Sequence, residues 1–186
     1  MILKKSIIVC GKICSGKSMV IKFISEQTKW PIVSFGAFIR DISLKQNLPA
    51  TRESYQQIGQ DLFENWGAKK LLLEAIKFSV PLGQENVLFD GVRHKSVFFE
   101  IKRICEQTFL IYLAADEKIR YDRFNSRKNV GDAGLSLEEF LKIDKQQIES
   151  GIEALGSSAD LIVDASRPTQ DIYQALMNFL TRERVI

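Results

Sequence analysis

Residues 11–18 spell Gly-Lys-Ile-Cys-Ser-Gly-Lys-Ser, a complete G-x-x-x-x-G-K-S motif. Glycines let a backbone wrap closely around phosphate oxygens, where side chains would collide. Successive backbone N–H groups and the N-terminus of a following helix attract negative charge. In such a loop the lysine, here Lys17, reaches the β- and γ-phosphates, and the serine, here Ser18, ligates Mg²⁺. The motif predicts a site for the phosphates of ATP, formed by Gly11, Lys12, Ile13, Cys14, Ser15, Gly16, Lys17 and Ser18.

The segments on either side of this motif are those that a phosphate-binding loop (P-loop) needs. The apolar run Ile7–Cys10 precedes it and is typical of a buried strand. Met19, Val20, Phe23 and Ile24 follow it at the spacing of one helix face. A chance match in an ordinary glycine turn is the alternative, and the strand, loop and helix in this order disfavour it.

A second acidic group is predicted at the end of another strand. Val87–Phe89 is an apolar run that ends at Asp90. The carboxyl ends of parallel strands meet at one edge of a sheet, which would place Asp90 beside the P-loop. There it could hold Mg²⁺ as the partner of Ser18, or accept a hydrogen bond from the attacking oxygen. The alternative is an aspartate in a simple turn.

Two arginines are candidates for binding a second phosphate. Arg93 closes the sequence Asp-Gly-Val-Arg that starts at Asp90, and Arg40 closes Ser-Phe-Gly-Ala-Phe-Ile-Arg from Ser34. After the predicted strand Ile32–Phe35, we expect the chain to turn at Gly36 and enter a helix. Two converging guanidinium groups bind a phosphate with bidentate geometry. The alternative is that these arginines form salt bridges, with Asp41 or Glu53 as candidates.

A row of arginines lies farther along the chain. Arg120, Arg123 and Arg127 are spaced at i, i+3 and i+7 and share a face of a helix that Asp116 can cap. A glycine-containing stretch, 128–134, follows, and Ser136 and Glu139 then form a capping box. The pattern favours a lid whose arginines neutralise a phosphoryl group during its transfer. The alternative is a solvated helix face.

The wider pattern of the chain predicts an α/β fold with a mostly parallel sheet. Helix-period stretches separate five apolar runs, which are Ile7–Cys10, Ile32–Phe35, Val87–Phe89, Phe109–Leu113 and Leu161–Val163. The longest helical stretch begins after Thr51, a good helix cap, and is expected to stop at Gly67. A further helix is expected after Pro168.

Composition narrows the class of protein. The chain has 186 residues, of which 45% are hydrophobic, and this suits one globular domain. A net charge of +3 gives little support to a nucleic-acid partner. No apolar run approaches the roughly 20 residues of a membrane span, and the start of the chain has no cleavage-like site. We therefore expect a cytoplasmic protein with no nucleic-acid or membrane partner, as a monomer or a homodimer.

Cysteine and histidine usage excludes several kinds of site. Cys10, Cys14 and Cys105 lack the spacing of metal ligands, and any disulfide scheme leaves one unpaired. Cys14 lies next to a helix N-terminus, where a redox role is conceivable, but a small apolar filler is the favoured interpretation. His94 is the single histidine, which excludes a multi-histidine metal site.

These motifs, in this order and over nearly the whole length, resemble the P-loop nucleoside and deoxynucleoside monophosphate kinases. The chain is also similar to their relatives, the dephospho-coenzyme A kinases. The resemblance rests on the P-loop, Ser34-x-Gly36-x-x-x-Arg40, Asp90-Gly-Val-Arg93 and the row Arg120, Arg123 and Arg127. The chain departs from adenylate kinases, which have Asp-Gly-Phe-Pro-Arg, because it lacks the proline in its Asp-Gly-Val-Arg. It also has Val97 at a position where several relatives carry an acidic residue.

The resemblance implies a three-layer P-loop NTP hydrolase fold with a five-stranded parallel sheet. Its core would comprise 1–36, 86–115 and 146–186, with a helical acceptor-binding insertion near 37–85 and a lid near 116–145. Residues implied to bind the acceptor are Ser34, Gly36, Arg40, Gln57 and Arg93. Residues implied to lie near adenine are Asp164, Ala165 and Ser166. Those implied to act in transfer are Lys17, Asp90, Arg120, Arg123 and Arg127, with Ser18 and Asp90 holding Mg²⁺.

The implied activity is transfer of the γ-phosphate from Mg·ATP to a nucleoside or deoxynucleoside monophosphate, a small-molecule nucleotide acceptor. Of three alternatives, a 5′-end polynucleotide kinase is disfavoured by the modest net charge of +3 and by the absence of an interleaved basic and aromatic patch. The other two stay open. One is a kinase like those acting on dephospho-coenzyme A, whose acceptor is a sugar hydroxyl. The other is a regulatory P-loop NTPase that changes conformation and transfers nothing.

Overall fold

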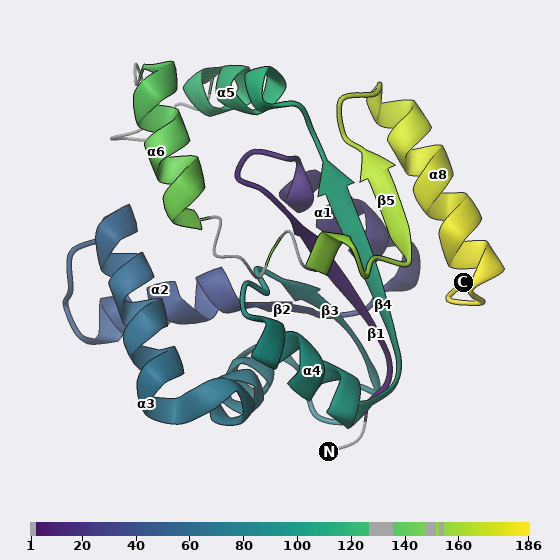
Figure 1. Cartoon of the computed structure of the whole chain (residues 1–186). Helices are drawn as coiled ribbons and strands as arrows, with labels where there is room; N and C mark the ends of the chain where they lie inside the picture. The colour runs from purple at the N-terminus through teal and green to yellow at the C-terminus, as the bar shows by residue number, and fades with distance from the viewer. Residues whose placement is uncertain (1–2, 127–135, 148–151, 153–154) are drawn as a thin grey trace. The chain divides into compact units, whose positions relative to one another are not determined.

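The computed structural model describes residues 3–126, 136–147, 152 and 155–186. Its strands are β1 (Leu3–Gly11), β2 (Ile32–Ser34), β3 (Asn86–Asp90), β4 (Cys105–Ala114) and β5 (Leu161–Asp164). They form one parallel sheet in the order β2-β3-β1-β4-β5 (Figure 1). The α/β class and the five predicted strands are confirmed.

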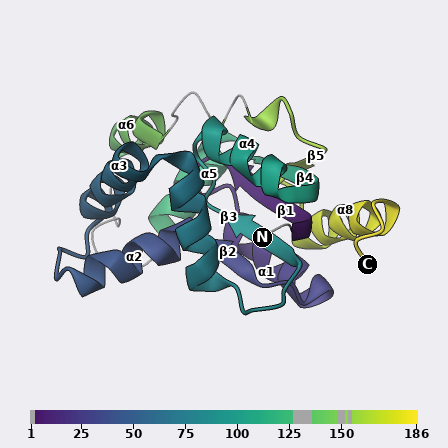
Figure 2. The same cartoon turned by 90° about the horizontal axis from the view of Figure 1, so that it is seen from below.

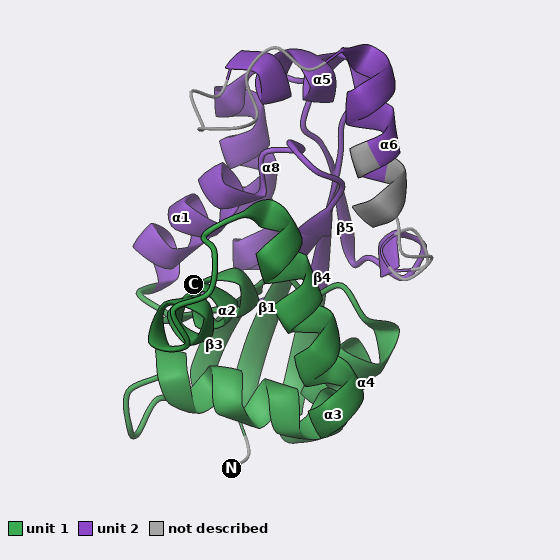
Figure 3. Ribbon diagram, turned by 90° about the vertical axis from the view of Figure 1, so that its left-hand side faces the viewer, with its two compact units in different colours: residues 1–8, 29–109 green, residues 9–28, 110–186 purple. Residues whose placement is uncertain are grey.

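The central strands are buried on both faces, and this explains why their sequences are continuous apolar runs. Ile7, Ile8 and Val9 of β1 have no solvent-exposed surface, and the same is true of Val87–Phe89 in β3. The edge strand β5 differs, because Ile162 is well exposed. Clusters of contacting residues divide the chain into two compact units, coloured in Figure 3. Unit 1 comprises 1–8 and 29–109, and unit 2 comprises 9–28 and 110–186.

Unit 1 carries the helices α2 (Phe35–Lys45), α3 (Arg52–Ser79) and α4 (Lys95–Ile104). The Thr51 hydroxyl accepts a hydrogen bond from the Ser54 N–H at 3.2 Å, so the predicted cap of α3 is confirmed. At Gly67 the backbone adopts φ 70° and ψ 169°, a conformation that only glycine adopts readily. The first helical stretch ends there as predicted, and a second begins at once, so that α3 is kinked.

One boundary in unit 1 differs from its prediction. The sequence pattern predicted a strand through Phe35 and a turn at Gly36, but β2 ends at Ser34 and Phe35 is already helical. The reason is the Ser34 side chain, whose hydroxyl accepts a hydrogen bond from the Ala37 N–H at 3.3 Å. This N-cap starts α2 directly after the strand and places Gly36 in its first turn.

Unit 2 carries α1 (Lys17–Thr28), α5 (Glu117–Ser126), α6 (Leu137–Gln147) and α8 (Thr169–Arg182). Helix α8 packs against β5 and α1 (Figure 2), and the Phe23 and Tyr173 rings stack with centroids 4.0 Å apart. Helix α6 begins with the predicted capping box: the Ser136 N–H donates to Glu139, and the Glu139 N–H donates to the Ser136 hydroxyl. These bonds from Ser136 hold the pKa of Glu139 below its usual value.

Among the helices in the described part of the chain, none has the length and apolar character to cross a membrane.

Candidate functional site

The predicted P-loop connects β1 directly to α1 in unit 2. Gly11 is the last residue of β1, with φ +149°, and Gly16 has φ +95° just before Lys17 opens α1. A Cβ atom on Gly11 would lie 2.6 Å from the Leu113 carbonyl oxygen and 2.8 Å from the Ser15 Oγ. Both distances are too short for real atoms, so only glycine fits at this position. Between the two glycines, Ile13, Cys14 and Ser15 are buried.

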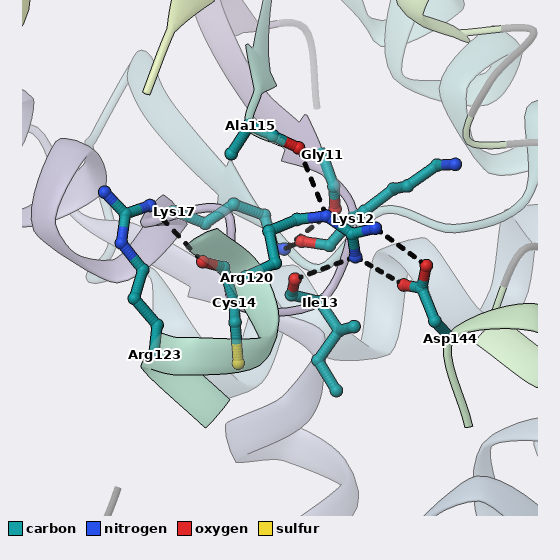
Figure 4. A network of polar contacts seen from close by, with 9 residues as sticks. All are labelled: Gly11, Lys12, Ile13, Cys14, Lys17, Ala115, Arg120, Arg123 and Asp144. Carbon is teal, nitrogen blue, oxygen red and sulfur yellow. Dashed lines mark hydrogen bonds and ion pairs between the residues drawn. The ribbon is translucent and has the colours of Figure 1, made fainter. Parts of the chain in front are cut away.

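The Lys17 side chain lies along the inside of its own loop. Its Nζ donates hydrogen bonds to the Gly11 carbonyl at 2.8 Å and to the Lys12 carbonyl at 2.7 Å (Figure 4). This contact holds the ammonium group within the loop in which a phosphate is expected. Ser18, the next residue, is exposed in the first turn of α1.

Arg120 is nearly fully buried, with 3% of its surface exposed. Its Nη1 and Nη2 form a bidentate ion pair with the Asp144 carboxylate at 2.6 and 2.9 Å. Nε donates to the Ala115 carbonyl at 3.2 Å, and Nη1 also donates to the Ile13 carbonyl at 3.3 Å (Figure 4). The alternative of a solvated helix face therefore does not hold for this residue. The proposed contact of Arg120 with a phosphoryl group stays a prediction.

Arg123 connects the P-loop with the loop that follows β5. Its Nη2 donates to the Ala165 carbonyl at 2.6 Å, and its Nη1 donates to the Cys14 carbonyl at 3.5 Å. Its Nη1 is also 3.9 Å from where a Cβ on Gly16 would lie. The structure thus brings together the P-loop, one arginine of the predicted row and the predicted adenine-side loop. Arg127 lies outside the described residues.

Hydrogen bonds fix the shape of the loop after β5, residues 164–166, which is the predicted adenine-side loop. The Asp164 carboxylate accepts a hydrogen bond from the Ser166 N–H at 3.0 Å, which lowers the pKa of Asp164. Asp164 also forms an exposed ion pair with Arg167 at 3.5 Å. Ala165 is buried, and its N–H donates to the Ala114 carbonyl at 2.7 Å. These bonds fix the carbonyl that Arg123 contacts.

An apolar cluster attaches α5 and α6 to the P-loop. Ile13 and Cys14 of the loop pack with Phe124 of α5 and Phe140 of α6. The Phe124 and Phe140 ring centroids are 5.2 Å apart. Cys14 is 4% exposed, which agrees with its interpretation as a small apolar filler. The neighbouring Cys10 is also buried, and burial raises the pKa of its thiol to about 12, so it stays protonated at neutral pH.

Sequence reasoning missed Asp144. One signal was present: it lies four residues after Phe140 in α6, so the two share a helix face. An acid on an apolar face needs a buried partner, and the predicted row of arginines stands nearby in the sequence.

Some of the predicted acceptor residues lie together in unit 1. The Ser34 hydroxyl donates to Asp90 Oδ2 at 3.4 Å, so the ends of β2 and β3 are linked. The Arg40 Nη1 is 3.4 Å from where a Cβ on Gly36 would lie, and Gly91, with φ +83°, lies against Gly36 and Phe35. Arg40 is exposed. Two separate sequence segments of this unit, 34–40 and 90–91, therefore meet here.

Two further acceptor candidates in unit 1 are exposed. Arg93 follows the buried Val92, and the next residue, His94, stacks on Phe63 with ring centroids 3.8 Å apart. Gln57 lies on α3, where its amide donates to Asp61 at 2.7 Å. Their role in acceptor binding stays a prediction.

The side chains predicted to hold Mg²⁺ fit its chemistry. The Ser18 hydroxyl and the Asp90 carboxylate supply oxygen, the donor that Mg²⁺ prefers. Within the described ranges no group of three or more His, Cys, Asp or Glu side chains is arranged to hold a metal ion.

Comparisons with known proteins bear on this geometry. A family model described as an AAA domain matches residues 7–160. A UPF0200 protein of Aeropyrum pernix is 31% identical over 161 residues, covering 84% of this chain and 82% of the relative. The chain is an AAA-domain protein of the UPF0200 family. Another UPF0200 relative, from Pyrobaculum aerophilum, is 28% identical and covers 95% of this chain and 97% of its own.

Several solved structures share the fold of this UPF0200 chain over nearly its whole length. TT1252 from Thermus thermophilus is similar with a TM-score of 0.65 and 16% identity, covering 98% of both chains. A shikimate kinase from Bacteroides thetaiotaomicron has a TM-score of 0.61 and 13% identity, covering 96% of this chain and 98% of its own. A gluconokinase from Sinorhizobium meliloti has a TM-score of 0.61 and 17% identity, covering 98% and 94%. The expected P-loop kinase-like fold is confirmed, whereas membership of the nucleoside monophosphate kinases stays a prediction.

Proposed function

We propose that this protein is an ATP-dependent phosphotransferase that moves the γ-phosphate of Mg·ATP to a small nucleotide acceptor. The observation that carries the proposal is the P-loop itself. It holds the Lys17 ammonium on the carbonyls of Gly11 and Lys12, with the Arg123 guanidinium at Cys14. Two cations on one phosphate-binding loop are suited to the charge that develops on a transferring phosphoryl group.

ATP would be bound by unit 2. The amides of the P-loop and the Lys17 ammonium bind its phosphates, and the loop of Asp164, Ala165 and Ser166 lies on the adenine side. Arg123 contacts both loops and would therefore orient the triphosphate relative to the base. Mg²⁺ would be held by the Ser18 hydroxyl, with Asp90 of unit 1 as its second predicted ligand, and it would neutralise charge on the phosphates.

The acceptor would be bound by unit 1. Arg40 lies beside the backbone of Gly36, so its exposed guanidinium can bind a phosphate together with Arg93. Asp90, whose carboxylate accepts a hydrogen bond from the Ser34 hydroxyl, can accept another from an acceptor group that carries a proton, such as a hydroxyl or a monoanionic phosphate. Gln57, on α3, can contact a base edge. We therefore favour a nucleoside or deoxynucleoside monophosphate as the acceptor class.

A panel assay tests this function. ADP formation from Mg·ATP is measured with each ribo- and deoxyribonucleoside monophosphate and with dephospho-coenzyme A. Shikimate and gluconate are added, because a shikimate kinase and a gluconokinase share the fold. Stimulation by one monophosphate, lost in Lys17→Ala, supports the proposal. Stimulation by a hydroxyl acceptor alone refutes the monophosphate class, and acceptor-insensitive hydrolysis supports the regulatory NTPase alternative.

The acceptor arginines give a separate prediction. We expect Arg40→Ala and Arg93→Ala each to raise the KM for the acceptor by about 10- to 100-fold, the worth of a hydrogen bond to a charged group. ATP affinity should stay unchanged, because neither residue belongs to the P-loop. Arg103→Ala is the matched control, since Arg103 is exposed on α4 and pairs with Glu100 at 2.6 Å. If the KM for the acceptor is unchanged in both variants, these arginines do not bind the acceptor.

A further inference from the structure

Four consecutive carbonyl groups of the P-loop each accept a hydrogen bond from a cationic side chain. Lys17 contacts the carbonyls of Gly11 and Lys12, Arg120 contacts that of Ile13, and Arg123 contacts that of Cys14 (Figure 4). All of these residues belong to unit 2. Both arginines lie on α5, far from the loop in the sequence: Arg120 is 107 positions after Ile13, and Arg123 is 109 positions after Cys14.

This arrangement matters for anion binding. A loop that binds phosphate must present its N–H groups to the anion, which requires that its carbonyl oxygens turn away. Cations on the carbonyls favour that orientation and neutralise the negative ends of the peptide dipoles. A loop held in its binding conformation before the ligand arrives loses less free energy on binding.

The cations differ in what holds them. Lys17 donates to the carbonyls of Gly11 and Lys12, and Arg123 donates to those of Cys14 and Ala165. A neutral carbonyl is a weaker partner for a cation than a carboxylate is. Arg120 is paired with Asp144, and both side chains are less than 5% exposed. Moving Arg120 onto a phosphate would leave Asp144 buried and uncompensated, which is strongly unfavourable. Arg120 is thus fixed where it is.

From this we infer that Asp144 is a positioning residue of the ATP site, acting through Arg120 on the Ile13 carbonyl. Arg120 then holds the P-loop in its conformation, and Arg123 and Lys17 are the residues that contact the phosphoryl group. The inference rests on the proposed ATP site but not on the identity of the acceptor. It deepens the proposal by separating the row of arginines into a structural member and a phosphate-binding member.

The test measures Mg·ATP affinity by calorimetry, at a temperature where circular dichroism shows each variant to be folded. We expect Asp144→Asn to weaken ATP binding by about 10- to 100-fold, the range found when an outer-shell group that supports a binding site is removed. Its melting temperature should fall by about 10 °C, because a buried charge loses its partner. Glu138→Gln is the matched control, because Glu138 is exposed on the same helix and pairs with Lys142.

A double variant separates positioning from stability. Arg120→Met with Asp144→Leu removes both buried charges, and such replacements often restore or raise stability. If the pair positions the loop, ATP binding stays weak although the melting temperature recovers. If the double variant binds ATP like the wild type, the pair is structural only and the inference is wrong.

Arg120→Lys provides a third measurement should the other variants not fold. Lysine keeps a positive charge beside Asp144, but its single ammonium cannot reach Asp144, Ile13 and Ala115 as the guanidinium does. We expect weaker ATP binding in a folded protein, and unchanged affinity would overturn the inference. Absence of ATP binding in the wild type would instead count against the proposed function, so the two failures are distinguishable.

Discussion

Lys17→Ala is expected to reduce phosphoryl transfer by about 10²- to 10³-fold while leaving the protein folded. The ammonium group is the positive charge held most closely within the P-loop, at 2.8 and 2.7 Å from two loop carbonyls. When a triphosphate binds, we expect the ammonium to leave these carbonyls and contact the phosphates. Its loss removes charge stabilisation in the transition state, and this lowers kcat.

The fold should tolerate this change because the Lys17 side chain is only partly buried. Melting temperature and kcat are therefore measured on the same samples. Lys22→Ala is the control, since Lys22 lies on the same helix and pairs with Glu26 at its exposed surface. Retention of kcat within tenfold in Lys17→Ala would show that the chemistry does not depend on this loop.

Gly11→Ala is expected to destabilise the protein by about 3 kcal/mol or more, the combined cost of backbone strain and overpacking. The new Cβ would lie 2.6 Å from the Leu113 carbonyl oxygen, which belongs to β4 in the middle of the sheet. It would also lie 2.8 Å from the Ser15 Oγ, which is completely buried. Neither neighbour can move without disturbing the sheet or the P-loop, so ATP binding should be lost as well.

The measurement is urea unfolding of the variant beside the wild type, with calorimetry for ATP. Gly83→Ala is the matched control, because Gly83 also has a positive φ of +86° but no atom lies within 4 Å of its Cβ position. Backbone strain alone then predicts a loss of about 1 kcal/mol. If Gly11→Ala and Gly83→Ala lower the free energy of unfolding by the same amount, the close contacts at Gly11 do not destabilise the variant.

Local patterns were sufficient to predict most of the elements that position the site. The central strands β1 and β3 are apolar runs because their residues are buried on both faces. Thr51 and the pair Ser136 and Glu139 cap helices through bonds that span three residues, so the sequence reveals them directly. Gly36 was harder, because a glycine fits both a turn and a helix, and the choice depended on the Ser34 cap.

What the sequence by itself determined is the chemistry available at the P-loop. Its glycines, Lys17 and Ser18 are fixed by local spacing, and spacing of this kind needs no long-range contact to be recognised. The same holds for the motifs that end in Arg40 and Arg93, because a guanidinium group is suited to phosphate wherever the chain places it.

Only the tertiary structure decided which partners the two arginines have. Arg120 and Arg123 are three residues apart on one helix and look equivalent in the sequence. Packing brings Asp144, 24 positions away, onto Arg120, whereas Arg123 meets the carbonyls of Cys14 and Ala165. The physical reason is burial: a charge removed from water must be paired, and its partner depends on which helix packs against it.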